Sequence, residues 1–173
     1  MNKTLLSTAL VAVIAAAAFV PAAHAANSGT INISGMVIAD TCKVDVNGGA
    51  TVALPTATTA QLGTVGATFG DTNFNVNLTD CDALVSSASM AFSGSNIDTN
   101  GNLNNAAAGG STAQVQLLTG GNVINMNTQD NAPTIAVNAG SGSVAMSARY
   151  YAKTAATTAG LVQSSVSFTL TYL

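Results

Sequence analysis

The end of the chain, residues 160–173, shows the clearest strand pattern in the sequence. Apolar side chains stand at nearly every even-numbered position: Val162, Val166, Phe168, Leu170 and Tyr172. The odd-numbered positions from Gln163 to Thr171 are all polar. Alternation with a period of two predicts a β-strand with one buried face. No residues follow this strand in the sequence to cover its outer edge, so we expect its pairing partner to come from elsewhere.

The N-terminal residues have the pattern of a secretory signal peptide. A lysine precedes a largely apolar stretch, residues 5–20, which is shorter than the about 20 residues of a membrane-spanning helix. The triplet Ala23–Ala25 fits the small-x-small cleavage rule. We expect residues 1–25 to be removed by cleavage between Ala25 and Ala26. The alternative is that residues 1–25 stay attached as an uncleaved membrane anchor. In the rest of the chain no stretch is long and apolar enough to cross a membrane, so we expect no membrane insertion of the mature chain.

Charged side chains are scarce. The chain has four Lys and Arg and seven Asp and Glu, for a net charge of −3. Binding to nucleic acid or to anionic lipid needs clustered basic residues, so both are excluded. We expect Arg149 and Lys153 to be solvated charges at the rim of the fold; the alternative is that either one bridges to another protein chain. The histidine, His24, lies in the signal peptide, which leaves no imidazole for triad catalysis or for a histidine-based metal site.

Two further patterns contain acidic residues in arrangements that can form chemical sites. Asp80 and Asp82 form a close carboxylate pair of the kind that glycosidases use, but a solvent-exposed pair in a loop is the more common case. Residues 98–102 resemble a calcium loop, yet the glycine is at the fourth rather than the sixth position and no acidic ligand follows at the twelfth. An Asn-Gly turn at Gly101 explains this segment better. We therefore predict no cofactor, no metal and no enzymatic activity.

Short β-type segments separated by Asn-Gly and Gly-Gly turns predict an all-β sandwich in one domain. No long stretch shows the 3.6-residue period of a helix. Gly120 and Gly121 are predicted to form a hairpin turn. Besides the C-terminal segment, the predicted strands are residues 29–33, 36–42, 51–54, 73–78, 88–92, 113–118, 135–137 and 142–151.

Cys42 and Cys81 are the two cysteines of the chain. In an exported protein the oxidising compartment makes a disulfide between them the expected state. The alternative, two reactive thiols, lacks a nearby base.

Several segments, taken in order and spacing, resemble the pilins of the chaperone–usher pathway, and the major subunit of type 1 fimbriae in particular. As in that family, a glycine, Gly160, lies fourteen residues from the C-terminus, and the penultimate residue, Tyr172, is aromatic. The chain departs from the family in the short tail before Gly29. The matching segments are residues 29–42, 52–55, 70–81, 92–94, 98–103, 148–152, 159–162 and 168–172.

The resemblance implies an incomplete immunoglobulin-like sandwich, the pilin fold, which lacks its final strand. Residues 26–35 would be an N-terminal donor-strand extension and residues 36–173 the pilin domain. A periplasmic chaperone would lend a strand, and at the outer-membrane usher the extension of the next subunit would replace it by donor-strand exchange. The implied donor residues are Gly29, Ile31 and Ile33, although these isoleucines have the alternative of pairing within their own domain. The implied acceptor-groove and chaperone or usher recognition residues are Gly160, Val166, Phe168, Leu170 and Tyr172.

The expected function is that of a structural subunit of an adhesive pilus, or fimbrium, exported through the periplasm to the cell surface. Its expected partners are other copies of itself, related pilins, the chaperone and the usher. The alternative within the same pathway is a minor, adaptor or tip pilin. A sugar-binding tip adhesin would need an added lectin domain, for which the length leaves no room, and the chain has no Trp to stack on a sugar.

Overall fold

The structure, a computed structural model, describes residues 32–35, 37, 41–46, 49 and 51–173. The chain divides into two units, residues 1–36 and residues 37–173, and each is described by itself. In the first unit, residues 32–35 lie outside any strand and are exposed, with Ile33 92% exposed. The expectations for the signal peptide, its cleavage at Ala25 and Ala26, and the donor residues Gly29 and Ile31 lie outside the described residues.

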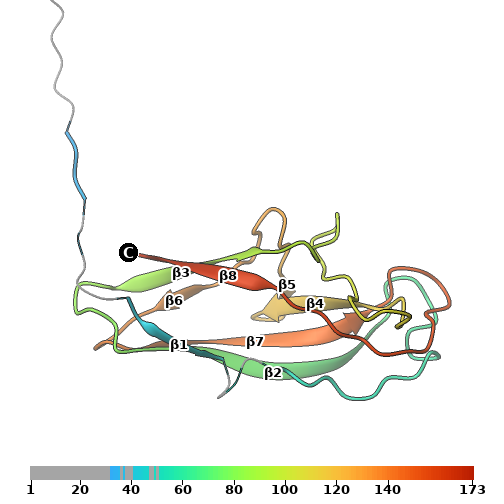
Figure 1. The fold of residues 1–173 in the computed structure, drawn as a ribbon. Helices are drawn as coiled ribbons and strands as arrows, with labels where there is room; N and C mark the ends of the chain where they lie inside the picture. The colour runs from blue at the N-terminus through green and yellow to red at the C-terminus, as the bar shows by residue number, and fades with distance from the viewer. Residues whose placement is uncertain (1–31, 36, 38–40, 47–48, 50) are drawn as a thin grey trace, which may run out of the picture. The chain divides into compact units, whose positions relative to one another are not determined.

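The second unit is a sandwich of two antiparallel sheets (Figure 1). One sheet has five strands in the order β1-β2-β7-β4-β5, and the other has three in the order β6-β3-β8. The described residues contain no helix, and so none with the length and apolar character that crossing a membrane requires. The all-β prediction is confirmed. The strands are β1 (Lys43–Val46), β2 (Thr68–Thr79), β3 (Ser87–Ser93), β4 (Gln114–Thr119), β5 (Asn122–Val123), β6 (Thr134–Ala136), β7 (Gly142–Tyr151) and β8 (Ser167–Tyr172).

The core fills the space between the two sheets. Successive side chains of a strand point to opposite faces, so every second residue of β2 and β3 is buried. In β2 these are Phe74, Val76 and Leu78, which alternate with polar residues that are exposed or half-buried. The matching residues of β3 are Ala88, Met90 and Phe92, and Met146 and Ala148 of β7 join the same cluster.

A hairpin turn and a disulfide confirm two local predictions. Gly120 and Gly121 have φ angles of +55° and +81°, which the tight turn joining β4 to β5 requires at both central positions. Cys42, just before β1, is bonded to Cys81, just after β2, with an S–S distance of 2.04 Å. The bond therefore fastens the outermost strand of the larger sheet to its neighbour.

Three strand predictions are wrong in whole or in part. In the predicted strand of residues 36–42, the described residues Val37, Thr41 and Cys42 lie outside any strand, and β1 begins only at Lys43. Residues 51–54 form no strand, although Val52 and Leu54 are partly buried against the core. A strand needs a hydrogen-bonded neighbour as well as an alternating sequence, and this segment faces a groove instead. At the other wall of that groove, the predicted strand of residues 160–173 is a strand only from Ser167 to Tyr172.

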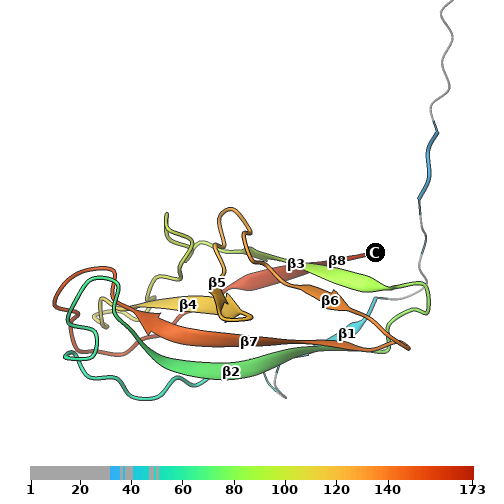
Figure 2. The same ribbon diagram turned by 180° about the vertical axis from the view of Figure 1, so that it is seen from behind.

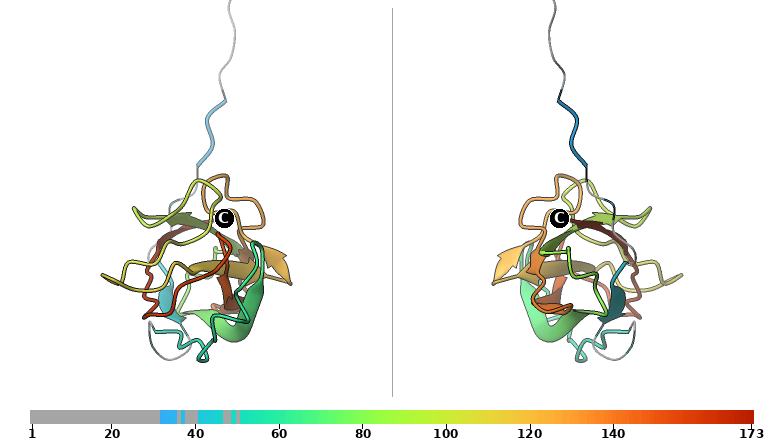
Figure 3. Two further views of the ribbon diagram at one scale, coloured as in Figure 1. Left: turned by 90° about the vertical axis from the view of Figure 1, so that its right-hand side faces the viewer. Right: turned by 90° about the vertical axis from the view of Figure 1, so that its left-hand side faces the viewer.

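Long loops meet at the end of the sandwich opposite the C-terminus, the end that the left view of Figure 3 faces. The loop before β2 and the loop after β7 are tied there by backbone hydrogen bonds. Gly66 N–H donates to Ala152 O at 2.9 Å, and Ala152 N–H donates to Ala67 O at 2.9 Å. These loops lie at one end of a groove between the C-terminal segment and the segment before β2.

Candidate functional site

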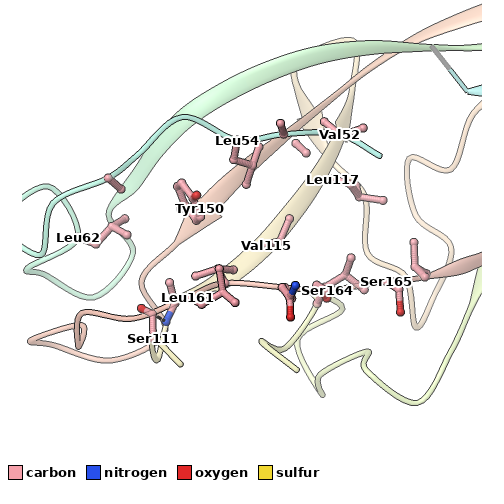
Figure 4. Close-up of a pocket in the computed structure, with 18 of the residues that line it drawn as sticks. Val52, Leu54, Leu62, Ser111, Val115, Leu117, Tyr150, Leu161, Ser164 and Ser165 are labelled. Atoms are coloured by element: carbon pink, nitrogen blue, oxygen red, sulfur yellow. Dashed lines mark hydrogen bonds between the residues drawn. The ribbon is translucent and has the colours of Figure 1, made fainter. Parts of the chain in front are cut away.

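A groove of about 1030 Å³ lies between the C-terminal segment and the segment before β2 (Figure 4). Val52 and Leu54 stand along one wall, and Leu161, Ser164 and Ser165 stand along the other. Between the walls lie Val115 and Leu117 of β4 and Tyr150 of β7. Because the floor belongs to the inner face of the five-stranded sheet, the groove is a gap in the three-stranded layer that would otherwise cover it.

The strand β8 has one paired edge and one open edge. Within the described residues it pairs with β3 alone. Ser87 N–H donates to Leu173 O at 3.1 Å, and Leu173 N–H donates to Ser87 O at 2.9 Å. Hydrogen-bonded pairs alternate along an antiparallel ladder, so the odd residues of β8 bond to β3. The backbone groups of the even residues, from Phe168 to Tyr172, therefore point to the open edge.

The predicted acceptor residues lie along this open edge. Gly160, Val166 and Phe168 line the groove, and Leu170 and Tyr172 continue along the same strand beyond it. The four apolar side chains are partly buried against the core. Each of them therefore turns its side chain inward while its backbone amide and carbonyl face the vacant position beside β8. A strand added there would gain backbone hydrogen bonds and cover the floor of the groove.

Residues 161–166 extend the same edge without forming a strand. Leu161 O accepts hydrogen bonds from Ser111 N–H at 3.1 Å and from the Asn105 side-chain nitrogen Nδ2 at 2.7 Å. Gln163 N–H donates to Asn105 Oδ1 at 2.8 Å, and Ala106 N–H donates to Gln163 O at 2.7 Å. Leu161 and Gln163 are thus bonded through their backbones on the inner side, where Ser164 Oγ also donates to Asn104 O at 2.9 Å. The backbone groups of the even residues Val162 and Ser164 therefore face the groove.

Gly160 begins this segment and is needed there for two reasons. Its φ is +148°, a backbone conformation that favours glycine. A Cβ atom at this position would lie 2.7 Å from the backbone carbon of Gly110 and from Ser111 N. The family resemblance predicted a role for Gly160. No sequence pattern predicted a role for Asn105 or Gly110, because the residues that they contact are far away along the chain.

The groove also holds polar groups. The side-chain oxygen of Thr157 is buried and has no hydrogen-bond partner among the described residues. Partial burial raises the pKa of the Tyr150 hydroxyl. The lining thus combines an apolar floor with hydroxyl-bearing walls, a surface suited to a peptide segment.

The expectation of solvated rim charges is wrong for Arg149, whose side chain is 22% exposed, and holds in part for Lys153, whose side chain is 44% exposed but paired. Arg149 Nε donates to Gln116 Oε1 at 3.0 Å, and its Nη1 lies 3.7 Å from Asp71 Oδ1. Lys153 forms an ion pair with Asp98, whose side chain is only 6% exposed. Cations beside buried or half-buried acceptors gain charge-assisted hydrogen bonds, which holds both side chains within their own domain.

The Asp98 carboxylate is buried and carries a shifted pKa. Its pKa is lowered, first by the hydrogen bond from Lys153 and second by the backbone N–H of Asn100. Gly101, with φ of +80°, closes the adjoining turn by donating its N–H to Asp98 O at 2.9 Å. This confirms the Asn-Gly turn that was preferred to a calcium loop.

Asp80 and Asp82 do not act together as a carboxylate pair. Asp80 Oδ2 lies 2.7 Å from Lys43 Nζ in an exposed ion pair, whereas Asp82 Oδ1 accepts the N–H of Leu84 at 2.8 Å. Among the described residues we find no cluster of three or more His, Cys, Asp or Glu side chains that is able to hold a metal ion.

Known proteins with similar sequences are fimbrial subunits. The family model for fimbrial proteins matches residues 31–173. The major fimbrial subunit SMF-1 of Stenotrophomonas maltophilia is 39% identical over 88% of this chain and 96% of its own. The A chain of the type-1 fimbrial protein of Escherichia coli K12 is 34% identical over 98% of both chains.

Solved structures show the same fold at lower identity. The P pilus rod subunit PapA has a TM-score of 0.62 and 15% identity, over 78% of this chain and all of that one. A subunit of a chaperone–usher pilus also has a TM-score of 0.62 and 15% identity, over 86% of this chain and 97% of that one. Taken together, the full-length matches and the sandwich with one open edge show that this chain belongs to the fimbrial protein family, the pilins of chaperone–usher pili.

Proposed function

We propose that this chain is the repeating structural subunit of an adhesive pilus and that it polymerises by donor-strand exchange. In this proposal the groove beside residues 160–172 of one copy receives the N-terminal extension, residues 26–35, of the next copy. The observation that supports it most directly is the open edge of β8 above a groove of about 1030 Å³. Strand addition to an exposed sheet edge is an established mode of recognition.

The extension has the chemistry that the groove needs. Gly29, Ile31 and Ile33 share one face of an alternating segment. Ile33 is 92% exposed, so it retains the free energy of burial, about 1.5–3 kcal/mol for a side chain of this size. If the extension were inserted beside β8, its backbone would pair with the even residues of the acceptor. Its isoleucine side chains would cover the apolar floor of the groove.

The proposal extends to export and assembly. Cleavage between Ala25 and Ala26 would release residues 1–25 and leave the extension, 26–35, ahead of the pilin domain, 36–173. A periplasmic chaperone would first occupy the open edge, with Gly160, Val166, Phe168, Leu170 and Tyr172 as the recognition residues. At the outer-membrane usher the next subunit would replace it, and the polymer would emerge as a surface fimbrium. The subunit's role is structural, with no catalytic step.

The alternative is a minor, adaptor or tip pilin. One observation favours the rod subunit. The matched relatives named as major or A-chain subunits are covered over almost their entire length.

Cysteine cross-linking of assembled material tests the proposal. Chains that carry Ile33→Cys and one further cysteine at Val162, Ser164, Val166 or Phe168 are expected to form covalent multimers, because facing residues of paired strands have Cβ atoms about 4.5–5.5 Å apart. A matched control places the second cysteine at Thr134, on β6 at the opposite edge of the same sheet. Sheared surface material that yields only monomers with every pair, or equal cross-linking at Thr134, contradicts the proposal.

A further inference from the structure

Asn105 is the most heavily hydrogen-bonded side chain beside the groove. Its Nδ2 donates to Leu161 O at 2.7 Å and to Ser111 O at 2.8 Å. Its Oδ1 accepts from Gln163 N–H at 2.8 Å and from Ala107 N–H at 3.0 Å. A carboxamide offers two N–H donors and an oxygen with two lone pairs, so its full capacity is used. Two of the four bonds hold the loop of residues 105–111, and the other two hold the groove wall.

The two bonds to the wall continue the pattern of the sheet. The β3–β8 ladder ends at the pair Ser93 and Ser167. Beyond that point no strand among the described residues bonds the inner edge of residues 161–166. Asn105 takes the place of that strand, together with Ala106 N–H on Gln163 O and Ser111 N–H on Leu161 O. The odd residues stay bonded inward, and the even residues Val162, Ser164 and Val166 keep their backbone groups toward the groove.

Two glycines allow this close approach. A Cβ atom at Gly110 would lie 2.3 Å from Leu161 O and 2.6 Å from Asn105 Nδ2. A Cβ atom at Gly160 would lie 2.7 Å from the backbone carbon of Gly110. Contacts this short are not tolerated, so a side chain at either position would push the groove wall away from Asn105. The loop and the wall therefore fit together only as the sequence stands.

We propose that Asn105 is a positioning residue for subunit docking, which holds Leu161 and Gln163 so that Val162, Ser164 and Val166 present an ordered backbone edge to the incoming strand. This inference rests on the proposed function, and the occupant of the edge is the N-terminal extension of another copy. Asn105 bonds the side of the wall that faces away from that strand, so it acts through the wall. The incoming strand then pairs with a wall that is already extended, which lowers the conformational entropy lost on docking.

Peptide binding to the mature chain tests this role. A synthetic peptide of residues 26–35 serves as the probe, and the variants are Asn105→Ala and Gly110→Ala. The control is Asn127→Ala, which removes a comparable carboxamide bond, Nδ2 to Asp98 O at 2.7 Å, away from the groove. We expect the affinity for the peptide to fall at least about 10-fold in both test variants, the equivalent of one net hydrogen bond or more, and to stay at the wild-type value in the control. Wild-type affinity in Asn105→Ala overturns the inference.

Amide hydrogen exchange separates this role from a general loss of stability. In the wild type without peptide, Gln163 N–H is expected to be protected, and Val162 and Ser164 N–H to exchange rapidly. In Asn105→Ala, protection of Gln163 should fall while the β2 and β7 amides keep theirs. Uniform loss across the sheets, or unchanged protection at Gln163, overturns the inference. If the wild-type chain binds no peptide, the proposed function fails, and the exchange result alone still decides whether Asn105 orders the wall.

Discussion

The two edges of the three-stranded sheet differ in whether their backbone groups have hydrogen-bond partners. At one edge, β6 has three residues, begins just after Pro133, and covers only part of β3 (Figure 2). The next part of β3 is capped by a side chain. Phe92 N–H donates to Gln129 Oε1 at 2.8 Å, and Gln129 Nε2 donates to Phe92 O at 2.9 Å. Gln129 therefore blocks strand pairing at Phe92, and β6 is kept short, two ways in which natural proteins protect sheet edges.

The other edge, formed by β8 and residues 161–166, is long and carries none of these protections. It contains no proline and no charged side chain. Its even residues all direct their backbone groups outward, and a groove rather than a neighbouring strand lies beside them. An edge of this kind invites pairing with another chain. This contrast supports the proposal that the open edge is the interface with another subunit.

The two edges also use carboxamides differently. Gln129 bonds both backbone groups of Phe92 and ends the sheet there. Asn105 bonds Leu161 and Gln163 on their inner side and prolongs the sheet, which leaves the outer side free. A carboxamide thus occupies the outer side of β3 at Phe92, whereas another carboxamide bonds only the inner side of residues 161–163.

Proline substitutions on the two sides of the C-terminal segment should have the largest effects. Thr169→Pro removes an N–H that bonds to β3 and leaves the Ala91 carbonyl unpaired, so we expect a loss of about 3 kcal/mol or more in the free energy of unfolding. Val166→Pro removes an N–H that faces the groove, so the free energy of unfolding should fall far less, by the packing lost with the partly buried valine, while peptide binding and polymer formation fall sharply. Denaturant unfolding and electron microscopy of surface filaments measure the two effects. Equal destabilisation by both changes would contradict the assignment of a paired and an open side.

Opening the closed edge should have an intermediate effect. Gln129→Ala leaves the N–H and C=O of Phe92 without partners, which should lower the free energy of unfolding by about 1–3 kcal/mol. Because β8 is on the far side of β3, affinity for the 26–35 peptide should not change. Urea unfolding and peptide titration check this. A variant that loses peptide affinity as much as stability would show that the two edges are coupled.

Acid should weaken the body of the domain more than its open edge. The folded state lowers the pKa of Asp98 below its ordinary value of 3.8, so the stabilisation is fully present above that value and is lost as the pH falls through the lower, folded-state pKa. Asp98→Asn should flatten this part of the profile and lower the melting temperature at neutral pH by about 2–4 °C. Thermal melts across acid pH measure it. An unchanged acid profile in the variant would exclude Asp98 as the titrating group.

The smallest effect is expected at the outer strand of the larger sheet. Lys43 and Asp80 form an ion pair whose side chains are 78% and 66% exposed. Exposed pairs of this kind gain little because water and salt screen them. Lys43→Ala should therefore leave the melting temperature and peptide affinity unchanged within error. A clear loss of melting temperature would mean that the ion pair stabilises the domain after all, and a clear loss of peptide affinity would mean that β1 takes part in docking.

Much of the sandwich was predictable from local patterns. The bounds of β7 agree with the predicted residues 142–151, and the buried face of β2 follows from Phe74, Val76 and Leu78. The disulfide followed from the number of cysteines and the compartment. These features depend on residues close together in sequence, or on a pairing with one possible partner.

The errors share a cause. Residues 51–54 alternate like a strand but pair with no strand among the described residues, and Arg149 looks like a solvated charge until its bond to Gln116 is known. In each case the deciding group is distant along the chain. Local pattern reports which side of a segment is apolar, and it carries no information about which backbone or side chain will lie next to it.

The sequence by itself determined the class of fold, the inward faces of its strands, the cysteine pair and the resemblance to pilins, because alternation, turn residues and family motifs are written locally. Only the tertiary structure decided which edge stays open and how its wall is held. Asn105 lies 56 residues from Leu161 and 58 from Gln163, so their hydrogen bonds exist only once the sandwich has formed. The period of two in residues 160–173 predicts a buried face, whereas the vacancy beside it is a property of the packed sheets.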